Sequence, residues 1–274
     1  MLEAKWDPLD AIMREGRERR ALLRAGLAME NRLRSYIWSL YAHNFQNVEE
    51  QDRPVIPTED VENLFKKKEY TPSSIRRPPP WATIKQDEWE KLVSFLVGIS
   101  MSAQKLMTYS RSLHADIVWC NKGISEAAGM LPVWEWVSGI RGIGKLGLGV
   151  LIAETGNLSF YPKHYYVWKR LGVAVIDGER QRRVANNPEL AIRLGYNPER
   201  RSVLFLTSQG LMKQNKNPDG SDGYYRGLYV ERKAHEAQKH PELIPMVHHL
   251  RALRYMSKIF VKHLWQAWRD HSPM

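Results

Sequence analysis

Residues 137–145 read Val-Ser-Gly-Ile-Arg-Gly-Ile-Gly-Lys and continue as a largely apolar stretch to Gly156. This pattern predicts a helix, a tight turn with two glycines, and a second helix. Gly142 and Gly144 allow left-handed backbone angles and a close approach to another surface. Ile143, between them, is expected to fill the gap between the two helices. The first amides of the second helix then point outward beside Lys145, where they can hold a phosphate.

The pattern is typical of a helix-hairpin-helix, a module that binds the nucleic-acid backbone without contacting base edges. The alternative is a plain helical turn that happens to contain two glycines. On the first interpretation, the residues expected to contact nucleic acid form one run: Arg141, Gly142, Ile143, Gly144 and Lys145.

Composition narrows the class of partner. The 274 residues include 41 Lys and Arg against 30 Asp and Glu, a formal net charge of +11, which favours a polyanion. The single cysteine, Cys120, excludes an internal disulfide and fits a reducing cytoplasm. No window approaches about 18 unbroken apolar residues, so no membrane span is expected. We therefore expect a cytoplasmic, nucleoid-associated protein encoded by a bacterium or a phage, with DNA or structured RNA as its partner.

Four segments are predicted along the chain. Residues 1–43 hold an arginine-rich helix, and residues 44–85 form a proline-rich linker with one short helix at 58–67. Residues 86–130 hold a helix with apolar residues at heptad spacing, and residues 131–274 form the hairpin domain. The predicted fold is mostly α, with an antiparallel coiled-coil arm and a compact helix-hairpin-helix domain.

The pattern predicts one continuous helix from Asp87 to Ile117, with a heptad seam interrupted only at Ser110, and it also suits formation of a dimer or higher oligomer. A short strand is expected at 173–176. Later helices are expected at 199–213, 224–239 and 245–269.

Further basic residues extend the expected nucleic-acid footprint. They lie on one face of the first helix, where a second strand or a structured RNA would bind, and in a basic turn after residue 178: Arg17, Arg20, Arg24, Arg180, Arg182 and Arg183. Four tyrosines near basic residues are candidates for stacking on unpaired bases: Tyr165, Tyr166, Tyr224 and Tyr225.

Several segments, in this order, resemble the DEDD-type insertion-sequence transposases related to the Piv invertase, some of which use a bridge RNA. The resemblance covers roughly residues 10–270 and is strongest from Ile140 to Leu171. The segments are Glu30–Arg34, Gly142–Gly144, Leu151–Leu158, Leu171–Ala174, Arg200–Arg201 and Tyr225–Arg226.

Two departures from that family bear on activity. The resemblance implies an N-terminal RuvC-like domain with four acidic residues, whereas this chain starts at the arginine-rich helix. It also implies a nucleophilic serine shortly after Ala174, where this chain has Val175–Arg180 without a serine. Asp177 cannot replace the alkoxide of a serine nucleophile. We therefore expect no catalytic residue, metal or cofactor in this chain, and any strand transfer would need a RuvC-like nuclease in trans.

Two other interpretations stay open. The hairpin also resembles that of the helix-hairpin-helix DNA glycosylases, but Lys145 lies one residue early for the catalytic lysine, and Lys163-His164 stands where an aspartate is expected. The other interpretation is an oligomeric structural or interaction protein of a phage or mobile element, in which the heptad helix drives self-association and the charge serves solubility.

Overall fold

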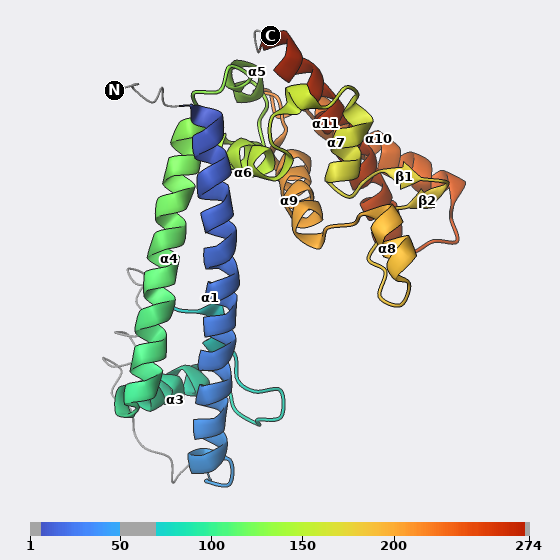
Figure 1. Cartoon of the computed structure of the whole chain (residues 1–274). Coiled ribbons are helices and arrows are strands. Elements are labelled where there is room, and N and C mark those ends of the chain that lie inside the picture. Colours follow the sequence, from blue (N-terminus) through green and yellow to red (C-terminus); the bar gives the residue numbers. More distant parts are fainter. Residues whose placement is uncertain (1–6, 50–69, 272–274) are drawn as a thin grey trace, which may run out of the picture. The chain divides into compact units, whose positions relative to one another are not determined.

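The computed structural model describes residues 7–49 and 70–271, so the short helix predicted at 58–67 lies outside the described residues. The prediction of a mostly α protein is confirmed, with a two-stranded sheet as the only sheet in this part of the chain (Figure 1). The α-helices are α1 (Pro8–Phe45), α3 (Gln86–Ile99), α4 (Met101–Ala128), α5 (Trp134–Ser138), α6 (Lys145–Thr155), α7 (His164–Arg170), α8 (Pro188–Leu194), α9 (Pro198–Gln214), α10 (Tyr224–Lys239) and α11 (Pro245–His271).

The chain divides into two compact units. One holds the described residues up to Arg17 and those from Asn121 onward, and the other holds Glu18–Cys120. This division differs from the predicted boundary at residue 131, and from the assignment of the whole first helix to an arm. The physical reason is burial, since Ala11 and Ile12 of α1 and Ala127 and Ala128 of α4 belong to the larger hydrophobic core.

In the second unit, α1 and α4 run side by side in opposite directions (Figure 1). Their packing includes Gly26 of α1, where an added Cβ would lie 3.9 Å from Ile117 of α4. The core of this unit combines residues of α1, α3 and α4 with one residue of the segment before α3: Leu33, Ile37, Tyr41, Phe45, Ile75, Trp89, Leu92, Val93, Leu96, Val97, Ala103 and Met107.

The prediction of one unbroken helix from Asp87 to Ile117 is wrong. The backbone at Ser100 is extended, with φ −111° and ψ 109°, and it separates α3 from α4. Ser100 caps the new helix, because its Oγ accepts a hydrogen bond from the Ala103 amide at 3.3 Å. Ile99, inside the stretch predicted as one helix, is 60% exposed at the break.

The described end of the predicted linker, residues 70–85, is packed rather than free. Ile75 is fully buried, and its carbonyl accepts a 2.9 Å hydrogen bond from the Trp89 indole of α3. The Tyr70 ring stacks on His114 of α4 with 3.8 Å between centroids. Apolar and aromatic side chains of this stretch therefore contribute to the core of the second unit.

In the first unit, small residues bring α6 close to its neighbours. A Cβ added to Gly149 would lie 3.0 Å from the Ile124 carbonyl oxygen and 3.2 Å from the Ala128 Cβ. On another face of α6, Gly16 of α1 lies so close to Ala153 that a side chain at residue 16 would overlap it. These contacts place the helix that follows the hairpin deep in the core, with Leu148 and Ile152 fully buried.

The sheet consists of β1 (Val175–Ile176) and β2 (Glu179–Arg180), joined by a turn at Asp177 and Gly178, with φ of 50° and 79°. It is shorter than the strand predicted at 173–176. The Ala174 carbonyl accepts from the Gln181 backbone amide at 3.2 Å, but the Ala174 amide donates to the side-chain oxygen of Gln181 at 2.9 Å, so regular strand pairing begins only at Val175. Asp177, next to the expected place of a serine nucleophile, is a turn residue.

Candidate nucleic-acid interface

The predicted hairpin between α5 and α6 forms as the sequence indicated. Ile143 is 7% exposed and lies in the core of the first unit, which confirms its predicted place between the helices. Arg141, Gly144 and Lys145 are exposed around it. The buried isoleucine therefore fixes the turn while its polar neighbours remain accessible.

The two glycines of the hairpin have different roles. Gly142 has φ +102°, and a Cβ there would lie 2.6 Å from the Gly210 carbonyl oxygen of α9, so both its angle and its packing require glycine. Gly144 has φ −100° and ψ 179°, which is extended backbone, so it does not use the left-handed angles that glycine allows. Nothing lies within 4 Å of a Cβ built on Gly144, and this side of the turn is open.

The first turn of α6 has no capping side chain from its N-cap residue, Gly144. In α8 and α9, by contrast, Asn187 and Asn197 accept from the third helical amide at 2.9 and 3.0 Å. The amides that open α6 thus keep hydrogen-bonding capacity for an acceptor outside the helix, together with the positive end of the helix dipole.

Lys145 takes a different path from the one expected. Its side chain runs toward the end of α4, where its Cε would lie 2.9 Å from a Cβ on Gly129. Its ammonium group lies 5.7 Å from the centroid of the Trp134 ring. Lys145 adds positive charge at the hairpin, with its side chain beside Gly129 and its ammonium group near the Trp134 ring.

Sequence reasoning missed Asn215, which ties the hairpin to two helices. Its amide nitrogen donates to the Arg141 carbonyl at 3.0 Å, and its oxygen accepts from the Tyr225 amide of α10, also at 3.0 Å. Asn215 is 7% exposed and follows the last residue of α9. The only signal in the sequence was an asparagine at the start of a polar loop, a position that is usually exposed.

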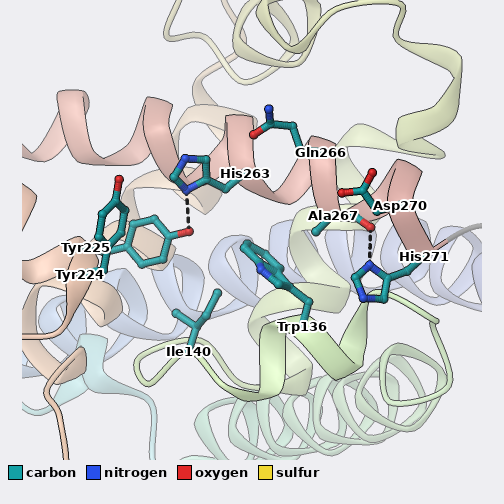
Figure 2. Close-up of a pocket in the computed structure, with 9 residues that line it drawn as sticks. All are labelled: Trp136, Ile140, Tyr224, Tyr225, His263, Gln266, Ala267, Asp270 and His271. Carbon is teal, nitrogen blue, oxygen red and sulfur yellow. Dashed lines mark hydrogen bonds between the residues drawn. The ribbon is translucent and has the colours of Figure 1, made fainter.

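A pocket of about 410 Å³ begins at the hairpin residue Ile140 (Figure 2). Tyr225 forms part of its buried wall, with its hydroxyl 3.1 Å from Nδ1 of His263, and Tyr224 is 61% exposed beside it. Burial, and then the charge of Lys262, lower the pKa of His263. The full lining is Trp136, Ile140, Tyr224, Tyr225, His263, Gln266, Ala267, Asp270 and His271.

The four candidate tyrosines fall into two pairs, and only one pair lines this pocket. Tyr224 and Tyr225 contribute to the aromatic wall beside the hairpin. Tyr165 and Tyr166 lie next to each other on α7, with 4.1 Å between their ring centroids.

The six candidate arginines fall into separate places. Arg180 lies on β2 and lines a pocket with residues of α10 and α11, while Arg182 lies 3.9 Å from Glu179. Arg183 is exposed. On α1, Arg17 and Arg24 are exposed and Arg20 is half-buried. The single basic footprint around the hairpin stays a prediction for these six side chains.

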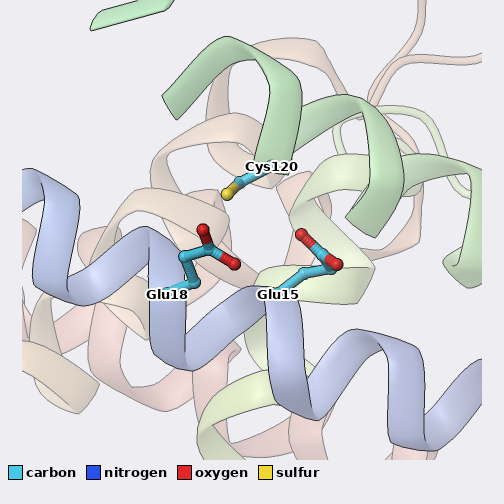
Figure 3. Close-up of side chains that lie close together, drawn as sticks. All are labelled: Glu15, Glu18 and Cys120. Atoms are coloured by element: carbon cyan, nitrogen blue, oxygen red, sulfur yellow. The ribbon is translucent and has the colours of Figure 1, made fainter. Parts of the chain in front are cut away.

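Two serines of α9 have structural roles. Ser208 is buried and lies 2.6 Å from the Ser257 hydroxyl, and Ser202 donates to the Pro198 carbonyl at 2.9 Å. Cys120 is fully buried. In the second unit a carboxylate oxygen of Glu18 lies within 4.8 Å of the Cys120 sulfur (Figure 3).

Comparison of the chain with family models, with curated proteins and with solved structures finds no match. Among the helices of residues 7–49 and 70–271, none combines the length and the apolar character needed to cross a bilayer.

Proposed function

We propose that this chain binds nucleic acid through the phosphate backbone, with the hairpin between α5 and α6 as the contact. The observation that carries the proposal is the division of the hairpin into a buried and an open side. Ile143 is in the core, whereas Arg141 and the uncapped start of α6 face solvent. A phosphate there would accept hydrogen bonds from backbone amides and gain the charge of Arg141.

The aromatic pocket beside the hairpin extends this function to unpaired bases. Its volume of about 410 Å³ lies within the range of small-molecule sites, ~300–1,000 Å³. Tyr224 offers an exposed ring for stacking, and Gln266 and Asp270 offer polar groups for a base edge. A strand whose phosphate rests on the hairpin would then place a neighbouring unpaired base in the pocket.

A place in mobile-element recombination is part of the proposal and is supported by the sequence resemblance alone. On this view the chain supplies binding, and a RuvC-like nuclease in trans supplies the chemistry. A role in recombination requires that the chain binds DNA or RNA. Nucleic-acid binding is therefore the first test of both assignments.

The test is binding of labelled duplex DNA and of a structured RNA, measured by fluorescence anisotropy at several salt concentrations. The logarithm of the affinity should fall linearly with the logarithm of salt concentration. Arg141→Glu and Lys145→Glu should weaken binding to all sequences alike, and each should reduce the salt slope by about 1. Lys122→Glu is the matched control, because Lys122 is an exposed cation on α4 that is not part of the hairpin. Equal affinities for all four proteins would reject the hairpin as the contact.

A second candidate function is self-assembly through the arm. It is favoured by large apolar side chains that are exposed on α1 and α4 within the second unit: Leu27, Tyr109, Val118 and Trp119, each between 53% and 65% exposed. Light scattering coupled to size exclusion tests this candidate. An oligomer that dissociates in Leu27→Ser and Trp119→Ser would support it, whereas a monomeric wild-type protein would dismiss it.

A further inference from the structure

We propose that a second pocket, formed by β1, β2, α10 and α11, binds a phosphate group. We call it the arginine pocket and define it by its charged lining: Arg180, Arg232, Glu236, Arg251, Arg254 and Lys258. It is a separate site from the hairpin, and it does not depend on the function proposed for the hairpin.

The charges of the arginine pocket are unbalanced. Five cationic side chains line it against one carboxylate, which leaves a formal excess of four positive charges. Glu236, which is 3% exposed, is shared by Arg232 and Arg251, the latter at 2.9 Å. Within the described part of the chain, no carboxylate comes within ion-pair distance of Arg180, Arg254 or Lys258. An anion is the missing partner for these three side chains.

The cations are close enough to oppose one another's charge. Burial, followed by the charges of Arg201 and Arg180, lowers the pKa of Arg254 to about 10. The pKa of Lys258 is also lowered, by burial and by Arg254. Like charges held together in this way are disfavoured until an anion neutralises them.

The basic groups are held in place before any ligand arrives. One terminal nitrogen of Arg254 donates to the carbonyls of Val173 and Ala174, both at 2.9 Å. The Lys258 ammonium lies 4.0 Å from the Trp168 ring centroid, and the Trp168 indole donates to the Lys258 carbonyl at 2.9 Å. Binding therefore requires little ordering of these long side chains.

Unused donors favour the same ligand. The Nε atoms of Arg232 and Arg251 are buried and have no hydrogen-bond acceptor, a costly state for a charged group. Guanidinium groups match the paired oxygens of a phosphate. The volume of about 180 Å³ is below the ~300–1,000 Å³ typical of drug-sized ligands, so it suits one compact anion.

Two sources could supply that group: a free phosphate or nucleotide, or the terminal phosphate of a nucleic-acid strand. The first measurement is titration calorimetry of the full chain with inorganic phosphate. We expect saturable binding and a rise in the thermal midpoint with phosphate concentration. Lack of binding at ~10 mM phosphate, the concentration at which even a weak ~1 mM site is mostly filled, would overturn the proposal.

Arg180→Gln is the decisive variant, because Arg180 is exposed on β2 and its replacement leaves the core intact. It should weaken phosphate binding by about tenfold or more, as loss of a charge-assisted hydrogen bond does. Arg193→Gln removes an exposed arginine that is paired with Glu179 outside the pocket and should leave the affinity unchanged. Equal weakening in both variants would show general electrostatics and overturn the site. Lys258→Gln gives a second test of the same pocket, with unfolding curves to confirm the fold.

The source is decided by comparing single-stranded oligonucleotides with a 5′-phosphate or a 5′-hydroxyl end. If the phosphorylated strand binds more tightly and Arg180→Gln removes the difference, the ligand is a strand end. If inorganic phosphate binds but the two strands bind equally, the ligand is a free phosphate compound. The arginine pocket and the hairpin share no residue, so nucleic-acid binding by Arg141→Glu tests the hairpin alone and phosphate binding by Arg180→Gln tests this pocket alone. Failure of the hairpin proposal and failure of this one are therefore separate results.

Discussion

Gly210→Ala tests how the hairpin is attached to α9. Gly210 lies inside a helix, where alanine is ordinarily better by ~0.5–1 kcal/mol. Here a Cβ would lie less than 3.0 Å from the Gly142 carbonyl oxygen, whereas ordinary contacts are 3.4–4 Å. The Cβ is fixed rigidly to the backbone of α9 and the Gly142 oxygen is a backbone atom, so the hairpin and α9 must separate by more than 0.4 Å, the difference between 3.4 and 3.0 Å.

Forcing extra volume into a packed contact costs ~1–3 kcal/mol. Gly227→Ala is the matched control, because Gly227 lies in α10 and nothing is within 4 Å of its Cβ position. The gain in helix propensity is common to both variants. We therefore expect Gly210→Ala to be less stable than Gly227→Ala by ~1–3 kcal/mol, with Gly227→Ala more stable than wild type.

Urea unfolding followed by circular dichroism measures the free energies, and hydrogen exchange of α9 peptides confines the effect to the unit that holds both glycines. Gly210→Ala should also weaken nucleic-acid binding, because the hairpin moves with its support. If Gly210→Ala is as stable as Gly227→Ala, the close glycine contact does not exist in solution and the reasoning fails.

Three further predictions concern stability. Asn215→Asp should lower the free energy of unfolding by ~1–3 kcal/mol, because it removes the donor to the hairpin carbonyl and buries a charge. Urea unfolding measures this, and an unchanged midpoint would contradict the role of Asn215. Ser100→Ala should destabilise the arm by ~0.5–2 kcal/mol through loss of the α4 cap, with Ser102→Ala as an exposed control, and equal effects would refute the cap. His164, His249 and His263 have pKa values lowered chiefly by burial, so the unfolded chain binds their protons more readily. The stability that these neutral histidines contribute is complete above pH ~6.5 and is lost as the pH falls through and below that value. The thermal midpoint should therefore fall from pH 7.5 to 5.5, and it should fall less steeply in His263→Gln. Equal slopes in the two proteins would contradict this prediction.

Local patterns in the sequence predicted the helices of the hairpin domain well. The expected bounds 224–239 match α10, and 245–269 falls two residues short of the end of α11. Gly142 and Ile143 also lie as expected, because a turn with φ above zero and an apolar plug is encoded within a few residues. Such features need no knowledge of the rest of the chain.

The features that were missed depend on contacts between distant residues or on competition between two local signals. At Ser100 the apolar spacing favoured one long helix, but a cap within the same stretch starts a new one. The Gly142–Gly210 contact joins positions 68 residues apart in the sequence, and no local pattern marks it. The arginine pocket combines a β-turn with two helices, so its excess of charge appears only once Arg180 and Arg254 lie on the same pocket.

The loop between α9 and α10 is closed at its base. The backbones of Lys216 and Asp222 form an isolated antiparallel β-bridge, and the Asn217 amide donates to the Ser221 carbonyl at 2.9 Å. Asn215, at the end of α9, also accepts a hydrogen bond from the first turn of α10. New chain ends between Asp219 and Gly220, or a fluorescent domain inserted there, should leave the fold undisturbed. The loop therefore provides an attachment point for a reporter or an immobilising tag on the unit that carries the hairpin.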